Sequence, residues 1–272
     1  MPQRQSRLEG KVAIVTGAGS SGQGVGVGKA TSILLAREGA KVLLVDQVIQ
    51  RAEETQAMIR EEGGEASVFE ADVTRAEDCR AMADAAVARY GGLHVLVNNV
   101  GVSGKFGSVV EVTEENWHAV LDINLKSMVL TSKYAVPRMI QTGGGSIVNI
   151  SSIAGMRLIS VPGSVPYSVS KGGVIALTTT MAVQHGRDNI RVNCVAPGYI
   201  YTPMVTSLVT EEKRELRKRT APLGTEGTAW DIAWAVVFLA SDESRWISGI
   251  VLPVDAGVLA TTPLVMLHHL QS

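Results

Sequence analysis

Near its amino terminus the chain reads Val12-Ala-Ile-Val-Thr-Gly17-Ala-Gly-Ser-Ser-Gly-Gln-Gly-Val-Gly-Val-Gly28, a short apolar run followed by six glycines in twelve residues. Apolar residues at helical spacing come next, over residues 28–37. A strand, a glycine-rich loop and a helix in this order let backbone N–H groups and the positive end of the helix approach a pyrophosphate. We therefore expect this segment to open a dinucleotide-binding fold.

The rest of the chain repeats an alternation of short β-branched runs and longer helical patterns. We expect strands near 11–16, 41–46, 66–70, 94–98, 145–150, 190–196 and 250–255. Helical apolar spacing lies between them, near 28–37, 49–62, 75–90, 114–142, 166–186 and 228–240. Right-handed crossovers place such helices on both faces of a parallel sheet. The pattern predicts an α/β, doubly wound Rossmann fold with a seven-stranded parallel sheet, whose ligands bind beyond the carboxyl ends of the strands.

The composition fits one large domain spanning residues 1–272. Hydrophobic residues make up 46% of the chain, which argues against disorder. The two cysteines, Cys79 and Cys194, are far apart and lack metal-type spacing, so we expect buried thiols in a reducing compartment and no metal site. The polar amino terminus offers no secretory signal, and the expected location is the cytoplasm.

Charge and hydropathy argue against nucleic acids and membranes as partners. The formal net charge is −1, and the basic residues of 213–219 share their segment with Glu211, Glu212 and Glu215, as on a solvated helix face. The most apolar late segment, 249–267, is broken by Pro253, Asp255 and Pro263, so it is not expected to cross a bilayer. A small molecule is the expected partner.

The glycine loop can be aligned in two ways. Gly17, Gly19 and Gly22 form a literal G-x-G-x-x-G, whereas Gly17 with Gly26 and Gly28 would place two glycines where the helix starts. Both arrangements would bind phosphate.

Asp46, at the end of the second expected strand, points to the choice of cofactor. A carboxylate there suits the two hydroxyls of an adenosine ribose and repels a 2′-phosphate. Gln47 and Val48 follow, so no arginine comes next to neutralise a phosphate. The expected cofactor is therefore NAD(H).

Tyr167-Ser-Val-Ser-Lys171 combines an acidic hydroxyl with an ammonium four residues later, on the same face of a helix. At about 4 Å and an effective dielectric near 20, the ammonium contributes about 4 kcal/mol. That would lower the pKa of a tyrosine from near 10 by roughly 3 units. The spacing predicts a general acid or base with Ser152 upstream; the alternative is an exposed pair on a surface helix.

Between Gly10 and Gly257 the chain resembles the short-chain dehydrogenase/reductase family in its single-domain form. The matching blocks, in order, are Thr16-Gly17 with Gly26-Val27-Gly28, Asp46, Ala71-Asp72-Val73, Asn98-Asn99-Val100-Gly101, Asn124, Ile150-Ser151-Ser152, Tyr167 with Lys171, and Pro197-Gly198.

The resemblance implies a role for each residue of a catalytic set. Tyr167 would exchange a proton with the substrate oxygen while hydride passes to or from nicotinamide C4. Ser152 would hydrogen-bond that oxygen. Lys171 would lower the pKa of Tyr167 and bond the nicotinamide ribose, and Asn124 would kink its helix and hold a water linked to Lys171.

The same resemblance implies a cofactor-binding set. Asp72 would contact the adenine, with a helix-capping role for Asp72 or Thr74 as the alternative. Ile200 and Thr202 would contact the carboxamide. The full set is Gly17, Gly19, Gly26, Val27, Gly28, Asp46, Asp72, Val73, Asn98, Val100, Gly101, Tyr167, Lys171, Pro197, Gly198, Ile200 and Thr202.

Three departures from the family pattern stand out. The glycine loop is about five residues longer than usual between Gly17 and Gly26. Val100 replaces a small alanine. The segment from Ser152 to Tyr167 is about two residues longer than usual, which enlarges the substrate loop.

The irregular stretch at about 200–224 is expected to be a substrate lid. Side chains from the substrate loop and the lid would form an apolar wall that favours a hydrophobic or cyclic ketone or alcohol. Closing the core beneath the lid is the alternative role for them. These side chains are Met156, Leu158, Ile159 and Val161 from the loop, and Tyr199, Met204, Val205, Leu208 and Val209 from the lid.

The apolar carboxyl-terminal tail, about 258–272, and the helix with Trp230 and Trp234 correspond to subunit contacts in the family. A homotetramer is therefore expected.

The leading hypothesis is an NAD-dependent oxidoreductase that interconverts a secondary alcohol and a ketone, with Tyr167 as the acid/base. One alternative is a catalytically silent NAD-sensing protein on the same fold. Another is a methyltransferase, which would not need Tyr167 with Lys171.

Overall fold

The strands of this protein are short runs of β-branched and aliphatic residues that form one parallel sheet in a computed structural model, which describes residues 6–160, 162–206 and 208–271. The strands are β1 (Val12–Thr16), β2 (Lys41–Asp46), β3 (Ala66–Glu70), β4 (Val95–Asn98), β5 (Gly145–Ile150), β6 (Ile190–Pro197) and β7 (Val251–Val254). Their order in the sheet is β3-β2-β1-β4-β5-β6-β7, and every neighbouring pair is parallel. The predicted doubly wound Rossmann fold is confirmed, and each strand ends within one residue of its expected bounds.

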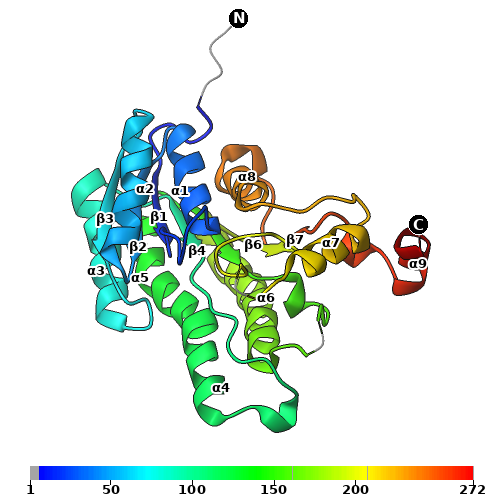
Figure 1. The fold of residues 1–272 in the computed structure, drawn as a ribbon. Helices are drawn as coiled ribbons and strands as arrows, with labels where there is room; N and C mark the ends of the chain where they lie inside the picture. The colour runs from blue at the N-terminus through cyan, green and yellow to red at the C-terminus, as the bar shows by residue number, and fades with distance from the viewer. Residues whose placement is uncertain (1–5, 161, 207, 272) are drawn as a thin grey trace, which may run out of the picture.

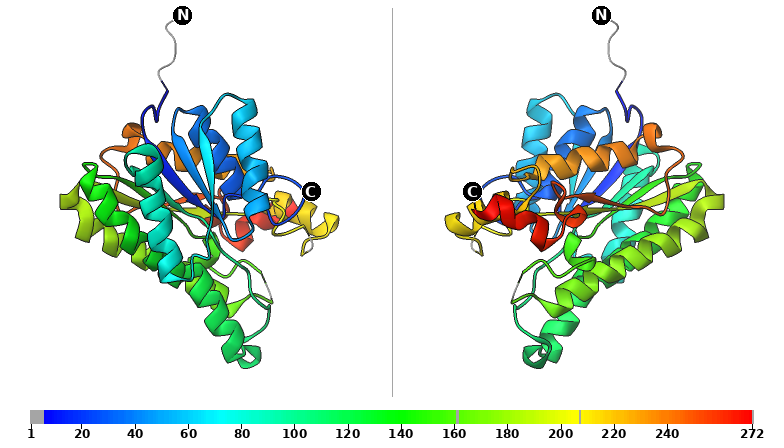
Figure 2. Two further views of the ribbon diagram at one scale, coloured as in Figure 1. Left: turned by 90° about the vertical axis from the view of Figure 1, so that its left-hand side faces the viewer. Right: turned by 90° about the vertical axis from the view of Figure 1, so that its right-hand side faces the viewer.

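Helices cover both faces of this sheet (Figures 1 and 2). One face carries α1 (Val27–Arg37), α2 (Ile49–Glu61) and α8 (Ala229–Ala240), and the other carries α3 (Ala76–Tyr90), α5 (Ser127–Gln141) and α6 (Val165–His185). Outside these two layers lie α4 (Glu114–Leu121), α7 (Glu211–Thr220) and α9 (Pro263–Gln271). Within the described ranges, no helix combines the length and apolar character that crossing a bilayer requires.

Alternation along the strands divides the core into two layers. In β1, Ala13 and Val15 pack with α1, α2 and α8, whereas Val12 and Ile14 pack with α3, α5 and α6. Successive side chains of a strand point to opposite faces, so every central strand is buried on both sides. This double burial explains why the strands read as continuous apolar runs.

One expected helix, 114–142, is divided in the structure. A π-helical turn, Asp122–Lys126, separates α4 from α5. Asn124 lies at the centre of this turn, and its side chain bonds the backbone of Val102 on a neighbouring segment. Single π-turns inside helices commonly mark functional sites.

The expected irregular lid contains a helix, so that part of the interpretation is wrong. Helix α7 begins after Thr210, whose hydroxyl accepts a hydrogen bond from the N–H of Lys213, and it has no buried residue. A helix that is polar on all sides has no apolar period from which it could be recognised. The tail also forms a helix, α9, which lies beside α7 (Figure 1), and Arg219 donates to the carbonyl of Leu270.

Candidate active site

Ser152, Tyr167 and Lys171 are brought together at the carboxyl end of β5. Ser152 lies two residues beyond this strand, and α6 begins at Val165 with a proline in its first turn, a position where the missing N–H costs nothing. Tyr167 therefore lies in the first turn of α6, with Lys171 one turn further on. The ammonium of Lys171 is buried, donates to the carbonyl of Ile150 at 2.9 Å, and lies 5.7 Å from the centre of the Tyr167 ring.

Burial governs the electrostatics of this trio. It raises the pKa of Tyr167, and a hydrogen bond from Ser152 acts in the opposite direction without reversing the change. It also lowers the pKa of Lys171 to about 8. The net direction for the pKa of Tyr167 is therefore opposite to the expected one, because removal of the phenol from water disfavours its charged form. The Lys171 ammonium is hydrogen-bonded to the carbonyl of Ile150.

Asn124 connects the π-turn to the same place. Its Oδ1 accepts from the N–H of Val102 at 2.8 Å, and its Nδ2 donates to the Val102 carbonyl at 2.9 Å and to Ser170 Oγ at 3.0 Å. A side chain at Gly101 would lie 3.3 Å from Lys171 Nζ and 3.4 Å from Asn124 Oδ1. Gly101 thus occupies the narrow space between the amide and the ammonium.

The glycine loop places the amino end of α1 beside the carboxyl end of β1. The helix begins at Val27, directly after Gly26, so the helix start belongs to the alignment of Gly17 with Gly26 and Gly28. A Cβ atom at Gly28 would lie 1.9 Å from the carbonyl oxygen of Gly17, and therefore only glycine lets α1 pack this closely on β1. Gly19 has a different role, because a Cβ there would lie 2.3 Å from Arg51 Cβ on α2.

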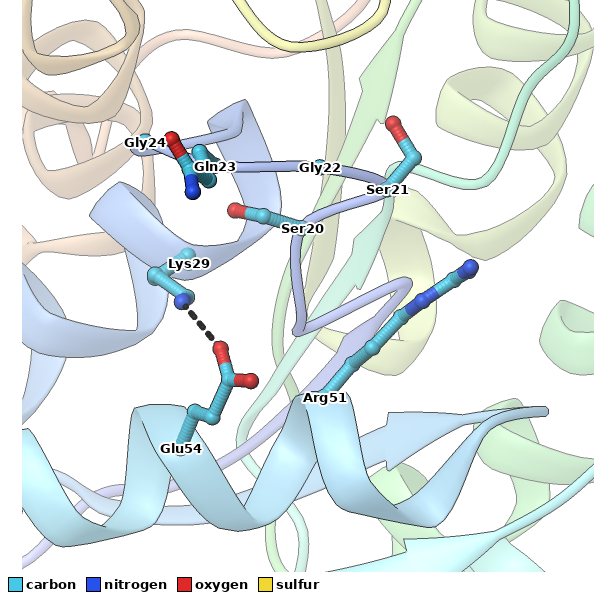
Figure 3. Close-up of a pocket in the computed structure, with 8 residues that line it drawn as sticks. All are labelled: Ser20, Ser21, Gly22, Gln23, Gly24, Lys29, Arg51 and Glu54. Carbon is cyan, nitrogen blue, oxygen red and sulfur yellow. Dashed lines mark hydrogen bonds and ion pairs between the residues drawn. The ribbon is translucent and has the colours of Figure 1, made fainter.

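The extra residues of this loop form a projection next to a hollow of about 310 Å³ (Figure 3). Lys29 and Glu54 form an ion pair of 3.1 Å at its floor, and the side chain of Arg51 extends on the other side. A Cβ atom added at Gly22 or Gly24 would lie 3.7 or 3.6 Å from the ring of Pro203, at the start of the lid. The lengthened loop therefore lies beside the lid.

Asp46 supports the glycine loop. Its two carboxylate oxygens accept from the N–H of Gly19 at 3.1 Å and from the N–H of Val48 at 3.0 Å. Each carboxylate oxygen retains a further acceptor site. The Asp46 carboxylate is therefore held beside the loop, where it can accept hydrogen bonds from ribose hydroxyls.

Asp72 organises a turn instead of capping a helix. Its Oδ1 accepts from the N–H and the hydroxyl of Thr74 at 2.9 and 2.7 Å, and its own N–H donates to Asp78 at 3.0 Å. The residue before α3 is Arg75, which makes no side-chain cap, so neither Asp72 nor Thr74 has the proposed alternative role. Asp72 lines a hollow of about 390 Å³ beyond β2 and β3, while the neighbouring Val73 is buried.

The side chain of Asn98 makes its hydrogen bonds within the protein interior. It is 1% exposed, donates to Asn149 at 2.9 Å and accepts from Thr131 at 2.6 Å. The neighbouring Asn99 belongs to the same matching block but has no role of its own in the expected sets, and its Nδ2 donates to the carbonyls of Thr16 and Gly17, both at 3.1 Å. Its position in the Asn-Asn pair was the available signal.

Val100 and the segment after β6 hold the remaining residues of the expected cofactor-binding set. Val100 packs on the core layer of α3, α5 and α6, and its Cγ2 would lie 3.2 Å from a Cβ at Gly17. A Cβ at Gly198 would lie 2.5 Å from Asp255 Cα, so this position also requires glycine, directly after Pro197 at the end of β6. Ile200 pairs with Gly227, and Thr202 is buried.

The expected substrate residues lie on the substrate loop and the lid. The Tyr199 hydroxyl donates to the carbonyl of Ile159 at 2.8 Å, which ties the two segments together. Four others expose more than two fifths of their surface, so closing the core is not their role; they are Met156, Leu158, Met204 and Leu208. Val161 lies outside the described residues.

Known proteins similar to this one match it over most of its length. A family model described as enoyl-(acyl carrier protein) reductase matches residues 22–259. A 3-oxoacyl-[acyl-carrier-protein] reductase of Thermotoga maritima is 41% identical over 93% of this chain and 99% of that protein. A cyclohexanol dehydrogenase of an Acinetobacter species is 36% identical over 92% and 95%. The solved structure of a 7α-hydroxysteroid dehydrogenase complexed with NADH and 7-oxo glycochenodeoxycholic acid superposes with a TM-score of 0.87 at 33% identity, covering 93% of this chain and 96% of that one. The parallel sheet and the residues that meet beyond the carboxyl end of β5 fit these matches, and the chain belongs to the short-chain dehydrogenase/reductase family.

Proposed function

We propose that this protein is an NAD-dependent oxidoreductase that interconverts a secondary alcohol and a ketone, with Tyr167 as general acid/base. The observation that carries the proposal is the convergence of Ser152, Tyr167 and the buried Lys171 beyond the end of β5. Ligands of doubly wound sheets bind at such strand ends. Relatives named for cyclohexanol and for a hydroxysteroid support an apolar or cyclic substrate.

The residues present fit a dinucleotide. The start of α1 and the glycine cradle offer N–H groups to a pyrophosphate, and only glycine fits at Gly28. Asp46 would accept the ribose hydroxyls and disfavour a 2′-phosphate, which supports NAD(H). The rest of the cofactor set, including Asp72, Gly101, Ile200 and Thr202, is proposed to contact the same cofactor.

In the direction of oxidation, the substrate hydroxyl gives its proton to the ionised Tyr167 and the carbinol carbon loses a hydride. A nicotinamide cofactor would supply the hydride acceptor at C4 and, in its oxidised form, a positive charge. Ser152 holds the substrate oxygen by a hydrogen bond. Lys171 adds positive charge near the ring of Tyr167, and Asn124 fixes the neighbouring backbone at Val102. Reduction runs the same steps backward.

The wider assignments belong to the proposal too. A single domain with a lid at about 200–224 and a tail at about 258–272 would act as a homotetramer in the cytoplasm. The lid and tail meet through α7 and α9. A catalytically silent NAD-sensing protein is the alternative, but it would have no need of the Tyr167 and Lys171 arrangement.

Absorbance at 340 nm tests the proposal directly. Purified protein is incubated with NAD and a panel of cyclic, aromatic and polyol secondary alcohols, and each active reaction is repeated with NADP. Turnover with NAD supports the reaction and the cofactor. NADH binding without turnover of any alcohol favours the silent alternative.

A further inference from the structure

Arg217, on the lid helix α7, is a half-buried cation that faces an aromatic ring. Its guanidinium carbon lies 5.2 Å from the centre of the Tyr199 ring. Burial lowers the pKa of Arg217. Across the ranges that the structure describes, no carboxylate forms an ion pair with it, although such pairs are common on the same helix. A partly desolvated cation of this kind favours an anion from elsewhere.

The carboxylates around Arg217 already have partners. Arg214 binds Glu226 through two nitrogens, at 3.0 and 2.5 Å, and binds Glu211 at 2.7 Å. Lys218 is paired with Glu215. Glu226 is the carboxylate whose charge acts on Arg217, yet both of its oxygens are bonded to Arg214. The helix therefore neutralises Arg214 and leaves Arg217 for another ligand.

Arg217 is connected to the proposed catalytic residues through Tyr199 and the substrate loop. Tyr199 lies two residues beyond the end of β6, and Ser152 lies two residues beyond the end of β5, the neighbouring strand. The Tyr199 hydroxyl reaches Ile159, in the loop that joins Ser152 to Tyr167. Arg217 therefore borders the substrate side of the site, one aromatic ring removed from the substrate loop.

We infer that Arg217 binds a carboxylate carried by the substrate, which is then an apolar or cyclic secondary alcohol or ketone with an acid group away from the reacting carbon. The planar guanidinium binds a carboxylate through two parallel hydrogen bonds. The exposed apolar side chains of Met156 and Leu158 would cover the hydrocarbon part. The inference rests on the proposed function, and it names the class of substrate.

Kinetics with matched substrates test it. Initial rates with NAD are measured for 4-hydroxycyclohexanecarboxylate, for its methyl ester and for cyclohexanol. In Arg217→Met, kcat/KM for the acid should fall about 10- to 100-fold while the two neutral alcohols change by less than about threefold. Lys213→Met is the control, because Lys213 is exposed on the same helix and has no ion pair in the described part of the chain. Equal losses in both variants would overturn the role of Arg217.

A binding measurement separates this inference from the proposed function. Calorimetry measures the affinity of the complex between the whole protein and NADH for cyclohexanecarboxylate. The same measurement is then made with the neutral carboxamide of this acid. Tighter binding of the acid that is lost in Arg217→Met supports the anion site, even if no alcohol is oxidised and the proposed reaction fails. Equal binding of acid and amide by the wild type overturns the site, even if cyclohexanol is oxidised and the reaction stands. The wild-type comparison decides by itself if the variant does not fold.

Discussion

Ser20 Oγ accepts a 2.8 Å hydrogen bond from the backbone N–H of Gly26, six residues further along the chain. The bond closes the lengthened glycine loop at the residue that precedes α1. Ser20 is 8% exposed, whereas Ser21 is exposed. The bond thus closes the loop between Ser20 and Gly26, beside Pro203 of the lid, and holds the residue that precedes α1.

Removing this bond should loosen the cradle. We expect Ser20→Ala to weaken NADH binding by about fivefold, since one such hydrogen bond is worth about 1 kcal/mol. Titration of NADH fluorescence measures the dissociation constant. Ser21→Ala removes the neighbouring exposed hydroxyl and should leave the constant unchanged. Equal affinity in wild type and Ser20→Ala would show that the loop is held by other contacts.

Tyr167→Phe should abolish proton exchange and keep the cofactor site. We expect turnover to fall by about 10²- to 10⁴-fold, the usual contribution of a general acid/base. The same preparation should bind NADH like the wild type. Tyr134→Phe, in the core layer around α5, serves as the control and should keep its activity. Undiminished turnover in Tyr167→Phe would remove Tyr167 from the mechanism.

The strands could be predicted from the sequence, whereas some of the helical structure could not. The strand bounds followed from uninterrupted apolar runs, because both faces of the sheet are buried. Helix α7 was missed because no residue of it is buried, and the π-turn at Asn124 was expected only as a kink because its geometry depends on tertiary bonds to Val102. Local sequence carries neither signal.

The electrostatics were harder to predict than the positions. The i to i+4 spacing correctly puts Lys171 beside the Tyr167 ring, but the direction of the pKa depends on burial, which spacing does not report. Asn98 and Asn99 give a similar lesson. Two adjacent amides look alike in sequence, yet one bonds inside the sheet and the other supports Gly17.

Asp46 provides a test of cofactor choice. Asp46→Asn keeps a side-chain oxygen for the loop but removes the charge that opposes a 2′-phosphate, so the preference for NAD(H) over NADP(H) should narrow by about 10-fold or more. The measurement is the ratio of kcat/KM for the two cofactors. Glu53→Gln removes an exposed charge from α2 and should leave the ratio unchanged. A wild type that already prefers NADP(H) would refute this role of the carboxylate.

Lys171 should also make stability depend on pH. Its pKa falls from 10.5 to about 8 on folding because burial disfavours the ammonium. Between these values the unfolded chain binds more protons than the folded one, so this group makes the folded state more stable as the pH rises. Below pH 8 both states hold the proton and the full cost of burying the charge is present.

The comparison with Lys171→Met isolates that contribution. Urea unfolding is measured at pH 7, 8 and 9. These pH values do not exceed the ordinary thiol pKa of 9.0, which limits the contribution of the two buried cysteines. Burial raises their pKa values to about 12 for Cys79 and about 11 for Cys194. From pH 8 to 9 the wild type should gain about 1 kcal/mol relative to the variant, since one proton per pH unit corresponds to about 1.4 kcal/mol. A constant difference between the two proteins would mean that Lys171 keeps an ordinary pKa, and that its ammonium is better solvated than its burial implies.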